Sequence, residues 1–417
     1  MKEKSFACVD NKIFVESNSI CPNCENSKMK IFYKKNNIPS HSVLIFNNPV
    51  EAINYPKGNI SLGFCEKCGF VGNLDFDLNL RAYSEKYEET QGFSETFQKF
   101  HIKLAQKLIE NYNIRNKSIL EIGCGKGEFI SMMCELADNK GYGFDPAYIP
   151  ERNNSPAKDK IVFIRDYYSE KYSNYKADFF VCKMTLEHIP DTLNFLNQIR
   201  KSIDNQYDSL VFFQIPNFEK ILMDCAFWDI YYEHCSYFTF CSLAELFRNA
   251  RFEVIDLELD YDDQYLMIIA KPSELFSFKK HKLENEIEDL KTLIETFSKN
   301  VSLTMKLWRK FFEKAKSENK KIILWGGGSK AVAFLTTLNL TSQIVCVVDI
   351  NPYKNNTYLP GTGHLVINPS SLKNYSPDIV IVMNPIYVPE IKKTLNSLEL
   401  FPEIIPIDSL NVLKYKE

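Results

Sequence analysis

The 417-residue sequence has no excess of positive charge, few glycines and prolines, and no long apolar run. Its 50 lysines and arginines are balanced by 53 acidic residues, so the whole chain lacks the positive field that holds proteins on nucleic acid or anionic membranes. A composition of 15 glycines, 18 prolines and 45% hydrophobic residues excludes a fibrous or disordered chain. We therefore expect a folded protein whose binding sites are local.

Hydrophobic segments that would suit a membrane or an export signal are also missing. No segment approaches the roughly 18 consecutive apolar residues of a membrane span, and residues 1–12 contain no stretch typical of a signal peptide. We expect a cytoplasmic monomer that binds neither membrane nor nucleic acid. Twelve cysteines in such a protein are better interpreted as thiols or metal ligands than as disulfides.

Four of the cysteines form two identical Cys-x-x-Cys pairs separated by 40 residues. Two such pairs can place four thiolates around one tetrahedral zinc ion, and Gly69 after the second pair suits the tight turn that directs backbone amides at the sulfur atoms. Four free buried thiols and a reactive redox pair are the alternatives, but the repeated spacing favours structural zinc. The predicted ligands are Cys21, Cys24, Cys65 and Cys68.

The order of the expected elements divides the chain into four parts. After a helix expected over 82–115, short apolar strands alternate with helical stretches, which predicts a doubly wound parallel α/β sheet. A charged stretch with one apolar helical stripe then predicts a connector that packs on the protein's own domains rather than in a coiled coil. We expect a zinc-binding domain at 1–81, an α/β domain at 82–273, the connector at 274–320 and a C-terminal Rossmann-like domain at 321–417.

A glycine-rich turn over 123–127 follows the first strand of the α/β domain and precedes a helix. Such a turn lets a ligand reach the amides at the helix N-terminus, and Asp145, after the second strand, is placed to accept the hydroxyls of a ribose. The first strand ends in an acid, Glu121, rather than in the glycine of a dinucleotide fingerprint. The alternatives to a nucleotide-like ligand site of this kind are a nicotinamide fold and a turn needed only for packing.

This turn resembles motif I of the class I S-adenosylmethionine-dependent methyltransferases. The resemblance implies S-adenosylmethionine as the methyl donor, with Asp166 near its adenine. The implied donor-binding residues are Glu121, Gly123, Gly125, Gly127, Asp145, Asp166 and Lys183.

The segment over 229–239 concentrates a carboxylate, an imidazole and phenols in a stretch without an apolar period. Imidazole is the side chain best suited to remove a proton near neutral pH, so His234 is a candidate base, and Glu233 and Tyr231 could orient it or raise its basicity. His188 follows the fourth strand beside the donor site and is a second candidate. A hydrogen-bonded surface loop and a structural histidine are the alternatives.

Taken together, the motifs resemble sugar C-methyltransferases that methylate C3 of a nucleotide-linked keto-deoxysugar. The resemblance rests on both Cys-x-x-Cys pairs, the segment over 81–87, the methyltransferase motifs, the Tyr-x-Glu-His-x-Ser-Tyr-Phe string and the C-terminal block, in the same order. It implies that His234 forms an enolate as general base, that zinc has only a structural role, and that a nucleotide-linked sugar is the substrate. It implies further sugar contacts from Tyr231, Glu233, His188, Tyr83, Ser84 and Tyr87.

A second glycine turn, over 325–331, begins the C-terminal part. With Asp349 after the next strand it matches a dinucleotide fingerprint, but about 97 residues hold only one mononucleotide half, so NAD is not expected. The resemblance implies a phosphate or sugar-nucleotide contact here, with Lys330 as a substrate-binding residue; packing alone is the alternative.

Two other functions are compatible with these motifs. One is an O- or N-methyltransferase that uses the same donor, and the other is a zinc-ribbon binding protein with a non-catalytic methyltransferase body. Residues 1–80 carry nine lysines and no arginine against eight acidic residues, which does not favour nucleic acid. The complete donor motif argues against a non-catalytic body.

Overall fold

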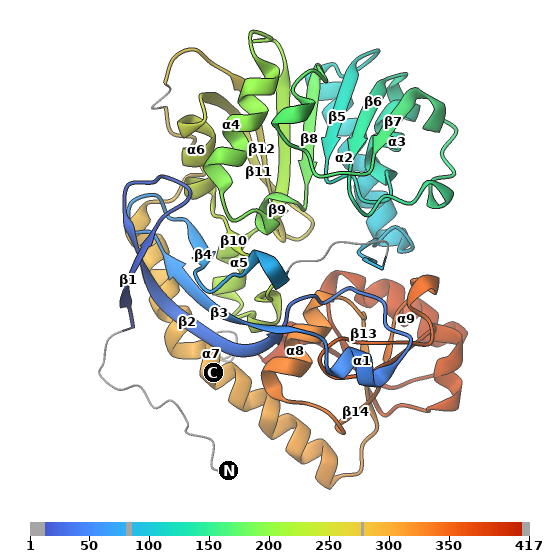
Figure 1. Cartoon of the computed structure of the whole chain (residues 1–417). Helices are drawn as coiled ribbons and strands as arrows, with labels where there is room; N and C mark the ends of the chain where they lie inside the picture. The colour runs from blue at the N-terminus through green and yellow to red at the C-terminus, as the bar shows by residue number, and fades with distance from the viewer. Residues whose placement is uncertain (1–12, 81–85, 277–278, 411–417) are drawn as a thin grey trace.

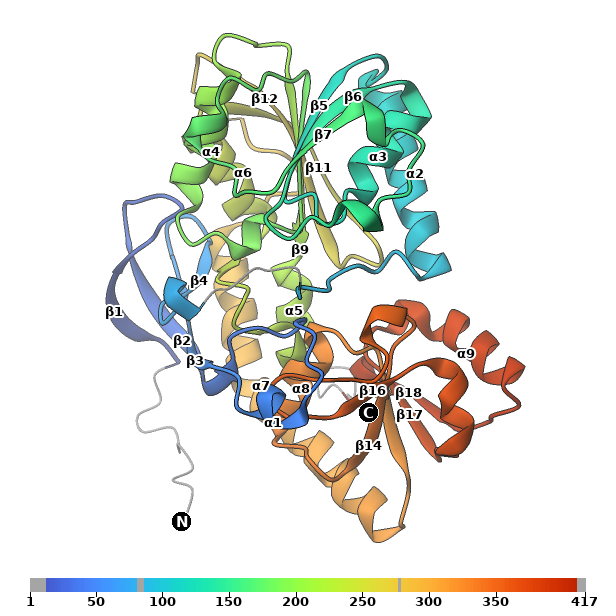
Figure 2. The same cartoon turned by 45° about the vertical axis from the view of Figure 1, so that its right-hand side comes forward.

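The computed structural model describes residues 13–80, 86–276 and 279–410, which form three sheets (Figures 1 and 2). Figure 1 shows the seven-stranded sheet at the top, the six-stranded sheet at the lower right and the N-terminal strands at the left. No helix in the described ranges is long and apolar enough to cross a membrane.

The seven-stranded sheet confirms the predicted doubly wound α/β fold. Five neighbouring strands are parallel, but β12 runs antiparallel to both of its neighbours, so the sheet is mixed rather than wholly parallel. A short turn between the last two strands makes them a hairpin, which requires the antiparallel direction. In spatial order the strands are β11 (Phe252–Asp260), β12 (Tyr265–Pro272), β9 (Leu210–Pro216), β8 (Phe179–Lys183), β5 (Ser118–Ile122), β6 (Lys140–Phe144) and β7 (Ile161–Ile164).

Helices cover both faces of this sheet because successive strand residues point to opposite sides. Ile119 packs with α2 and α3, whereas Leu120 packs with α4 and α6. The helix expected over 82–115 is shorter than predicted: Ser94 caps it by accepting the amide of Phe97, and the exposed Phe93 lies outside it. The covering helices are α2 (Glu95–Tyr112), α3 (Glu128–Ala137), α4 (Thr192–Ile203) and α6 (Phe240–Asn249).

The N-terminal sheet is antiparallel and ends in a strand from the α/β part. Ser236 pairs with Gly72 and Tyr237 pairs with Val71, so β10 joins the edge of β4. The segment that contains His234 is therefore attached to the N-terminal sheet. The strands, in spatial order, are β1 (Val15–Ile20), β2 (Lys28–Pro39), β3 (Lys57–Phe64), β4 (Val71–Asn73) and β10 (Ser236–Tyr237).

The C-terminal sheet is larger than the single mononucleotide half expected from its length. Parallel strands lie on both sides of β13, which places a topological switch point above the second glycine turn. The length estimate was wrong because the strands are short and 3₁₀ turns replace most crossover helices. The elements are β15 (Thr357–Tyr358), β16 (Leu365–Ile367), β14 (Ile344–Val348), β13 (Ile322–Trp325), β17 (Ile379–Val382) and β18 (Glu403–Pro406), with α8 (Ser329–Leu338) and α9 (Val388–Ser397).

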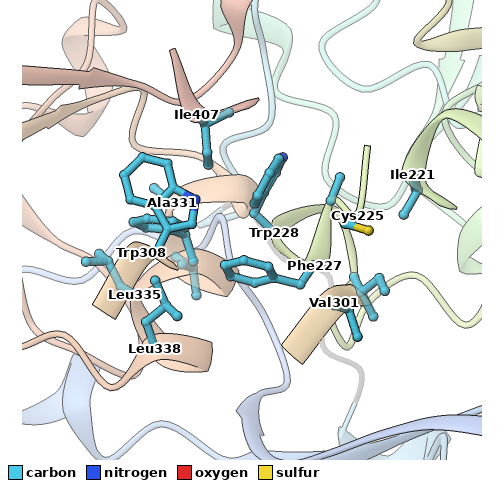
Figure 3. Close-up of a cluster of buried hydrophobic side chains, with 14 of the residues drawn as sticks. Ile221, Cys225, Phe227, Trp228, Val301, Trp308, Ala331, Leu335, Leu338 and Ile407 are labelled. Atoms are coloured by element: carbon cyan, nitrogen blue, oxygen red, sulfur yellow. The ribbon is translucent and has the colours of Figure 1, made fainter. Parts of the chain in front are cut away.

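The long helix α7 (Ile287–Ser317) lies within the predicted connector and packs on α5 (Phe218–Met223), α8 and β2. Figure 3 shows the apolar cluster that results, in which Phe227 and Trp228 approach Trp308 and α8. The ring centroid of Phe334 lies 5.0 Å from that of Trp308 and 5.8 Å from that of Phe227. Burial of these aromatic groups holds the segment before His234 against the C-terminal unit.

Candidate functional site

One cavity of about 650 Å³ lies between the seven-stranded sheet and the C-terminal unit. Both glycine turns line it, from opposite sides, together with the strap over 86–91 and the segment over 228–234. Both sheets present the carboxyl ends of parallel strands at a switch point here, the place where open α/β sheets bind ligands. The structure therefore brings the two sequence motifs together on a shared space.

The first glycine turn is shaped by backbone that a side chain would disrupt. Gly123 has φ +71°, and an added Cβ would lie 2.0 Å from Thr185 Oγ1. The amide of Gly125 donates to Asp145 Oδ2 at 2.9 Å, and that of Ala147 donates to Oδ1 at 2.7 Å. Burial raises the pKa of Asp145. This carboxylate both braces the turn and faces the cavity.

The other residues that are predicted to bind the methyl donor also line this cavity, but their hydrogen-bond partners and burial differ. Glu121 is buried, accepts the amide of Ile130 at 3.0 Å, and has its pKa raised to about 7 by burial. Lys183 is buried beside His101, with 2.9 Å between Nζ and Nε2, and burial lowers its pKa to about 8. Burial lowers the pKa of His101 to about 2, so this neutral imidazole accepts from the ammonium.

Asp166 lies at the outer side of the cavity, after β7. Its carboxylate pairs with Lys171 and accepts the hydroxyl of Tyr172 at 2.6 Å. The Lys171 ammonium lowers the pKa of Asp166 to about 2, which keeps the group ionised. A carboxylate in this position can accept hydrogen bonds from a ligand.

The strap over 86–91 crosses the donor turn, a feature that sequence reasoning missed. Lys126 donates to the backbone carbonyls of Tyr87 and Ala147, each at 3.0 Å, and pairs with Glu89 at 3.6 Å. Burial raises the pKa of Glu89 to about 7. Tyr87 lines the cavity as predicted for a sugar contact, whereas Tyr83 and Ser84 lie outside the described residues.

The predicted base, His234, is almost completely buried at 4% exposure in the wall of the cavity. Its Nε2 lies 3.0 Å from the hydroxyl of Tyr231, and its ring lies 4.9 Å from that of His188 at 82°. Burial, and then the neighbouring His188 and Lys330, hold the pKa of His234 well below its ordinary value. The imidazole is therefore neutral and able to accept a proton.

A backbone carbonyl helps to orient His188. Its Nδ1–H donates to the carbonyl oxygen of Glu233 at 3.0 Å. Because a carbonyl only accepts, this bond places a proton on Nδ1. His188, Tyr231 and His234 thus form a cluster of hydrogen-bonding groups in the cavity wall.

The expectation that Glu233 orients His234 is wrong. Its carboxylate instead contacts His41 Nδ1 at 3.1 Å and accepts both the amide and the hydroxyl of Ser42. Tyr232 and Glu233 lie in a turn that the amide of His234 closes by donating to Tyr231 O at 3.2 Å, and this turn directs the Glu233 side chain away from His234. Ser42 Oγ also lies 2.7 Å from Ser329 Oγ, whose hydroxyl can donate to it, and this contact links the N-terminal part, Glu233 and α8.

A group that sequence reasoning missed lies on the other side of His234. Glu187, in the short η5 turn (Leu186–His188) after β8, has an oxygen 4.0 Å from His234 Nε2. Glu187 directly precedes His188, the second candidate base, in the segment after the fourth strand of the α/β domain. The sequence did not indicate the contact between Glu187 and His234, because the two residues are 47 positions apart along the chain.

The second glycine turn, over 326–328, faces the cavity from the C-terminal unit. The amide of Gly327 donates to Asp349 Oδ2 at 2.8 Å, the same arrangement as between Gly125 and Asp145. An added Cβ at Gly328 would meet no atom within 4 Å. Lys330 lines the cavity but forms an ion pair with Asp229.

The four predicted zinc ligands come together in a separate site. Their Sγ atoms all lie within 4.8 Å of one another, with 3.6 Å between Cys21 and Cys68 and 3.8 Å between Cys24 and Cys65. Tetrahedral zinc with Zn–S bonds of about 2.3 Å would place sulfurs about 3.8 Å apart. Gly69 has φ +76° and closes the second turn by donating to Cys65 O. The four thiols therefore fit a tetrahedral metal ion.

Two family models match the chain. Residues 94–257 match a methyltransferase domain, and residues 271–400 match a C-methyltransferase C-terminal domain. The C-methyltransferase NovU of Streptomyces niveus is 24% identical over 220 residues, which are 49% of this chain and 50% of that protein. The chain thus spans about half the length of this curated relative.

Several solved methyltransferase structures resemble part of the chain. The 1,6-didemethyltoxoflavin-N1-methyltransferase of Burkholderia thailandensis is 18% identical, with 42% of this chain and 79% of that chain covered and a TM-score of 0.33. The magnesium protoporphyrin IX methyltransferase of Synechocystis is 13% identical, with 43% and 84% covered and a TM-score of 0.33.

Proposed function

We propose that the chain is an S-adenosylmethionine-dependent methyltransferase that transfers the methyl group to a carbon atom of a nucleotide-linked keto-deoxysugar, which its similarity to a methyltransferase domain, a C-methyltransferase C-terminal domain and NovU supports. The observation that carries the proposal is the shared cavity, which is lined by the donor turn, a neutral buried histidine and a second glycine turn. C-methylation of this kind needs all three: a donor site, a base and a site for the rest of the substrate.

On the donor side, the turn over 123–127 and Asp145 would hold S-adenosylmethionine, which supplies an electrophilic methyl group when bound. The carboxylate of Asp145 would accept the ribose hydroxyls, and Asp166 lies further out along the same edge, where the adenine would extend. Glu121 and Lys183 shape the inner end of this site from the carboxyl ends of β5 and β8. Glu89 and Lys126 close it from the side of the strap.

On the chemical side, His234 would remove a proton from the carbon next to the ketone. The C–H bond breaks, an N–H bond forms on the imidazole, and the electron pair moves onto the ketone oxygen to give an enolate. The hydroxyl of Tyr231 would stabilise the enolate oxygen by hydrogen bonding. The enolate carbon would then bond to the donor's methyl group as the methyl–sulfur bond breaks and S-adenosylhomocysteine leaves. The burial of His234 would keep water out of these steps.

The nucleotide part of the substrate would extend toward the second glycine turn. Open space above Gly328 and the amides at the start of α8 suit a phosphate group. Lys330 stands in the first turn of this helix and adds positive charge on the same side. A zinc ion on the four cysteines would have only a structural role, because that site is separate from the cavity.

A mass-spectrometric screen tests the proposal. The protein is incubated with S-adenosylmethionine and a panel of nucleoside-diphosphate-linked 4-keto-6-deoxysugars, and the matched 4-hydroxy sugars serve as controls. We expect a gain of one methylene on a keto sugar and none on its hydroxy control. In deuterated solvent with S-adenosylhomocysteine, the carbon-bound proton should also exchange.

Other results would replace the proposal by one of its alternatives. Methylation of the hydroxy sugars without exchange at carbon would indicate an O-methyltransferase. Methylation at an amino sugar would indicate an N-methyltransferase. Donor binding without turnover of any member of the panel would favour a binding protein with a non-catalytic body.

A further inference from the structure

Glu187 is an anomaly in the wall of the cavity. Its side chain is buried, at 1% exposure, and neither carboxyl oxygen has a hydrogen-bond partner among the described residues. Burying a carboxyl group without partners is costly, so such groups are rare outside functional sites. The residue lines the same cavity as the donor turn and His234. The role of Glu187 therefore depends on the groups that its side chain faces.

The nearest polar group is the imidazole of His234. Glu187 Oε1 lies 4.0 Å from His234 Nε2, and the hydroxyl of Tyr231 lies 3.0 Å from the same nitrogen. The other nitrogen, Nδ1, has no hydrogen-bond partner among the described residues. Two polar groups therefore converge on Nε2, whereas Nδ1 has none.

The backbone holds the two side chains face to face. The amide of Cys235 donates to the carbonyl of Glu187 at 2.9 Å, and Ser236 Oγ donates to Ile189 O at 2.7 Å. These bonds tie the turn after β8 to the segment that carries His234. Catalytic hydrogen bonds are often long in the absence of substrate, and the 4.0 Å separation is consistent with such a bond.

We propose that Glu187 is a positioning residue that acts through His234. Its carboxylate faces Nε2 and stabilises the imidazolium that forms when His234 takes the substrate proton. The inference rests on the proposed function. In the step itself, the substrate C–H bond breaks, an N–H bond forms on His234, the electron pair moves to the ketone oxygen, and the imidazolium lies against the Glu187 carboxylate.

The local charges give this pair a defined pH dependence. Burial raises the pKa of Glu187 to about 8, whereas burial holds that of His234 well below its ordinary value. Near pH 7 the carboxyl is thus mostly protonated, and the carboxylate forms as the pH rises through about 8. The rate of the enolisation step should rise over the same interval. The titratable groups that face the pair are Tyr231, Cys235, His188, Cys182 on β8, Tyr265 on β12 and Lys330 on α8.

The variant Glu187→Gln tests the proposal because it keeps the size of the side chain but cannot ionise. With the keto sugar that the wild type methylates, we expect kcat to fall on the order of 10²-fold, with little change in KM. The rise of kcat through pH 8 should disappear, and Glu187→Asp should restore part of it. Glu219→Gln removes another partly buried carboxyl outside the cavity and should leave both the rate and the pH profile unchanged.

Three results would overturn the proposal. Glu187→Gln could keep the wild-type rate and pH profile, or it could lower the rate equally at every pH, which would indicate a structural role only. A second zinc ion in the wild type that is lost in Glu187→Gln would make the carboxylate a metal ligand instead.

Two measurements without substrate separate this inference from the proposed function. Infrared difference spectra should show a protonated carboxyl in the wild type at pH 6 that is absent in Glu187→Gln and disappears above pH 8. Nitrogen NMR at pH 9 should show different chemical shifts for the His234 ring nitrogens in the wild type and in Glu187→Gln, because only the wild type carries a negative charge beside Nε2. If both spectroscopic results are as expected but no keto sugar is methylated, the proposed function is wrong and the interaction between Glu187 and His234 is supported. If a keto sugar is methylated but the spectroscopic results differ from expectation, only the proposed role of Glu187 is wrong.

Discussion

Lys330, in the first turn of α8, forms an ion pair with Asp229, which lies five residues before His234. The pair joins the second glycine turn to the segment that carries the proposed base. Phe227 strengthens this link, because its ring stacks at 13° on that of Phe334 in α8. A ligand that binds at the second glycine turn thus lies against the same structural unit as His234.

A side chain at Gly328 should block the substrate without damaging the fold. An added Cβ meets no protein atom within 4 Å and points into the cavity, so Gly328→Val should fold normally. We expect KM for the nucleotide sugar to rise at least about 10-fold, because the added methyl groups occupy the space for phosphate. Val345→Thr, at an exposed position on β14, is the control. An unchanged KM would show that the turn contacts no substrate.

Replacement of His234 should abolish two reactions together. In His234→Asn, methyl transfer and exchange of the carbon-bound proton should both fall by roughly 10²–10⁴-fold, because one base serves both. Donor affinity should remain, since the donor turn is formed by other elements. His281→Asn, outside the cavity, controls for loss of a histidine. If His188→Asn abolishes methylation while His234→Asn retains it, the base is His188.

Donor affinity should depend on Asp145. The variant Asp145→Ala removes the acceptor for the ribose hydroxyls and the brace on the amide of Gly125. Hydrogen bonds to a charged group contribute about 1.5–3 kcal/mol, so the dissociation constant should rise roughly 10- to 100-fold. Calorimetric titration with S-adenosylhomocysteine measures the change, and Asp159→Ala at an exposed position is the control. Equal affinities would remove Asp145 from the donor site.

Zinc should be present once per chain and should stabilise the N-terminal sheet. Loss of one ligand in Cys68→Ser should release the ion and lower the unfolding midpoint by roughly 5–10 °C. Because β4 pairs with β10, which follows His234, the rate should also fall. Elemental analysis and thermal unfolding measure both effects, with Cys241→Ser as control. Carefully purified wild-type protein without zinc would exclude the site.

The buried Glu187 should make stability depend on pH. Its pKa of about 8 in the folded state is above the ordinary 4.5, so the folded chain binds more protons between these values and loses stability as the pH rises. Relative to Glu187→Gln, the wild type should lose on the order of 1–4 kcal/mol between pH 5 and pH 8.5. Urea midpoints measure this difference. Glu313→Gln, at an exposed position on α7, should show no such dependence on pH. A constant difference would mean that Glu187 is not protonated in the folded state.

Much of the fold was predictable because it depends on local spacing. Apolar runs bounded by turns marked the strands β5 to β9, β11 and β12, but not β10, and the helix α3 begins where the glycine turn ends. The hairpin direction of β11 and β12 and the extra strands of the C-terminal sheet were not predictable. Both depend on pairing between strands that are far apart in sequence, and the local pattern of a short apolar strand does not indicate which strands it pairs with.

The sequence by itself determined the features whose chemistry lies within a few residues: the Cys-x-x-Cys turns, the two glycine turns and the acids that follow their strands. Only the tertiary structure decided how these features combine. It placed the four thiols at zinc-like separations, aimed Glu233 at Ser42 rather than at His234, and put Glu187 against His234 instead. The physical reason is that local motifs depend on backbone geometry along the chain, whereas the partner of a buried charge depends on packing between segments far apart in sequence.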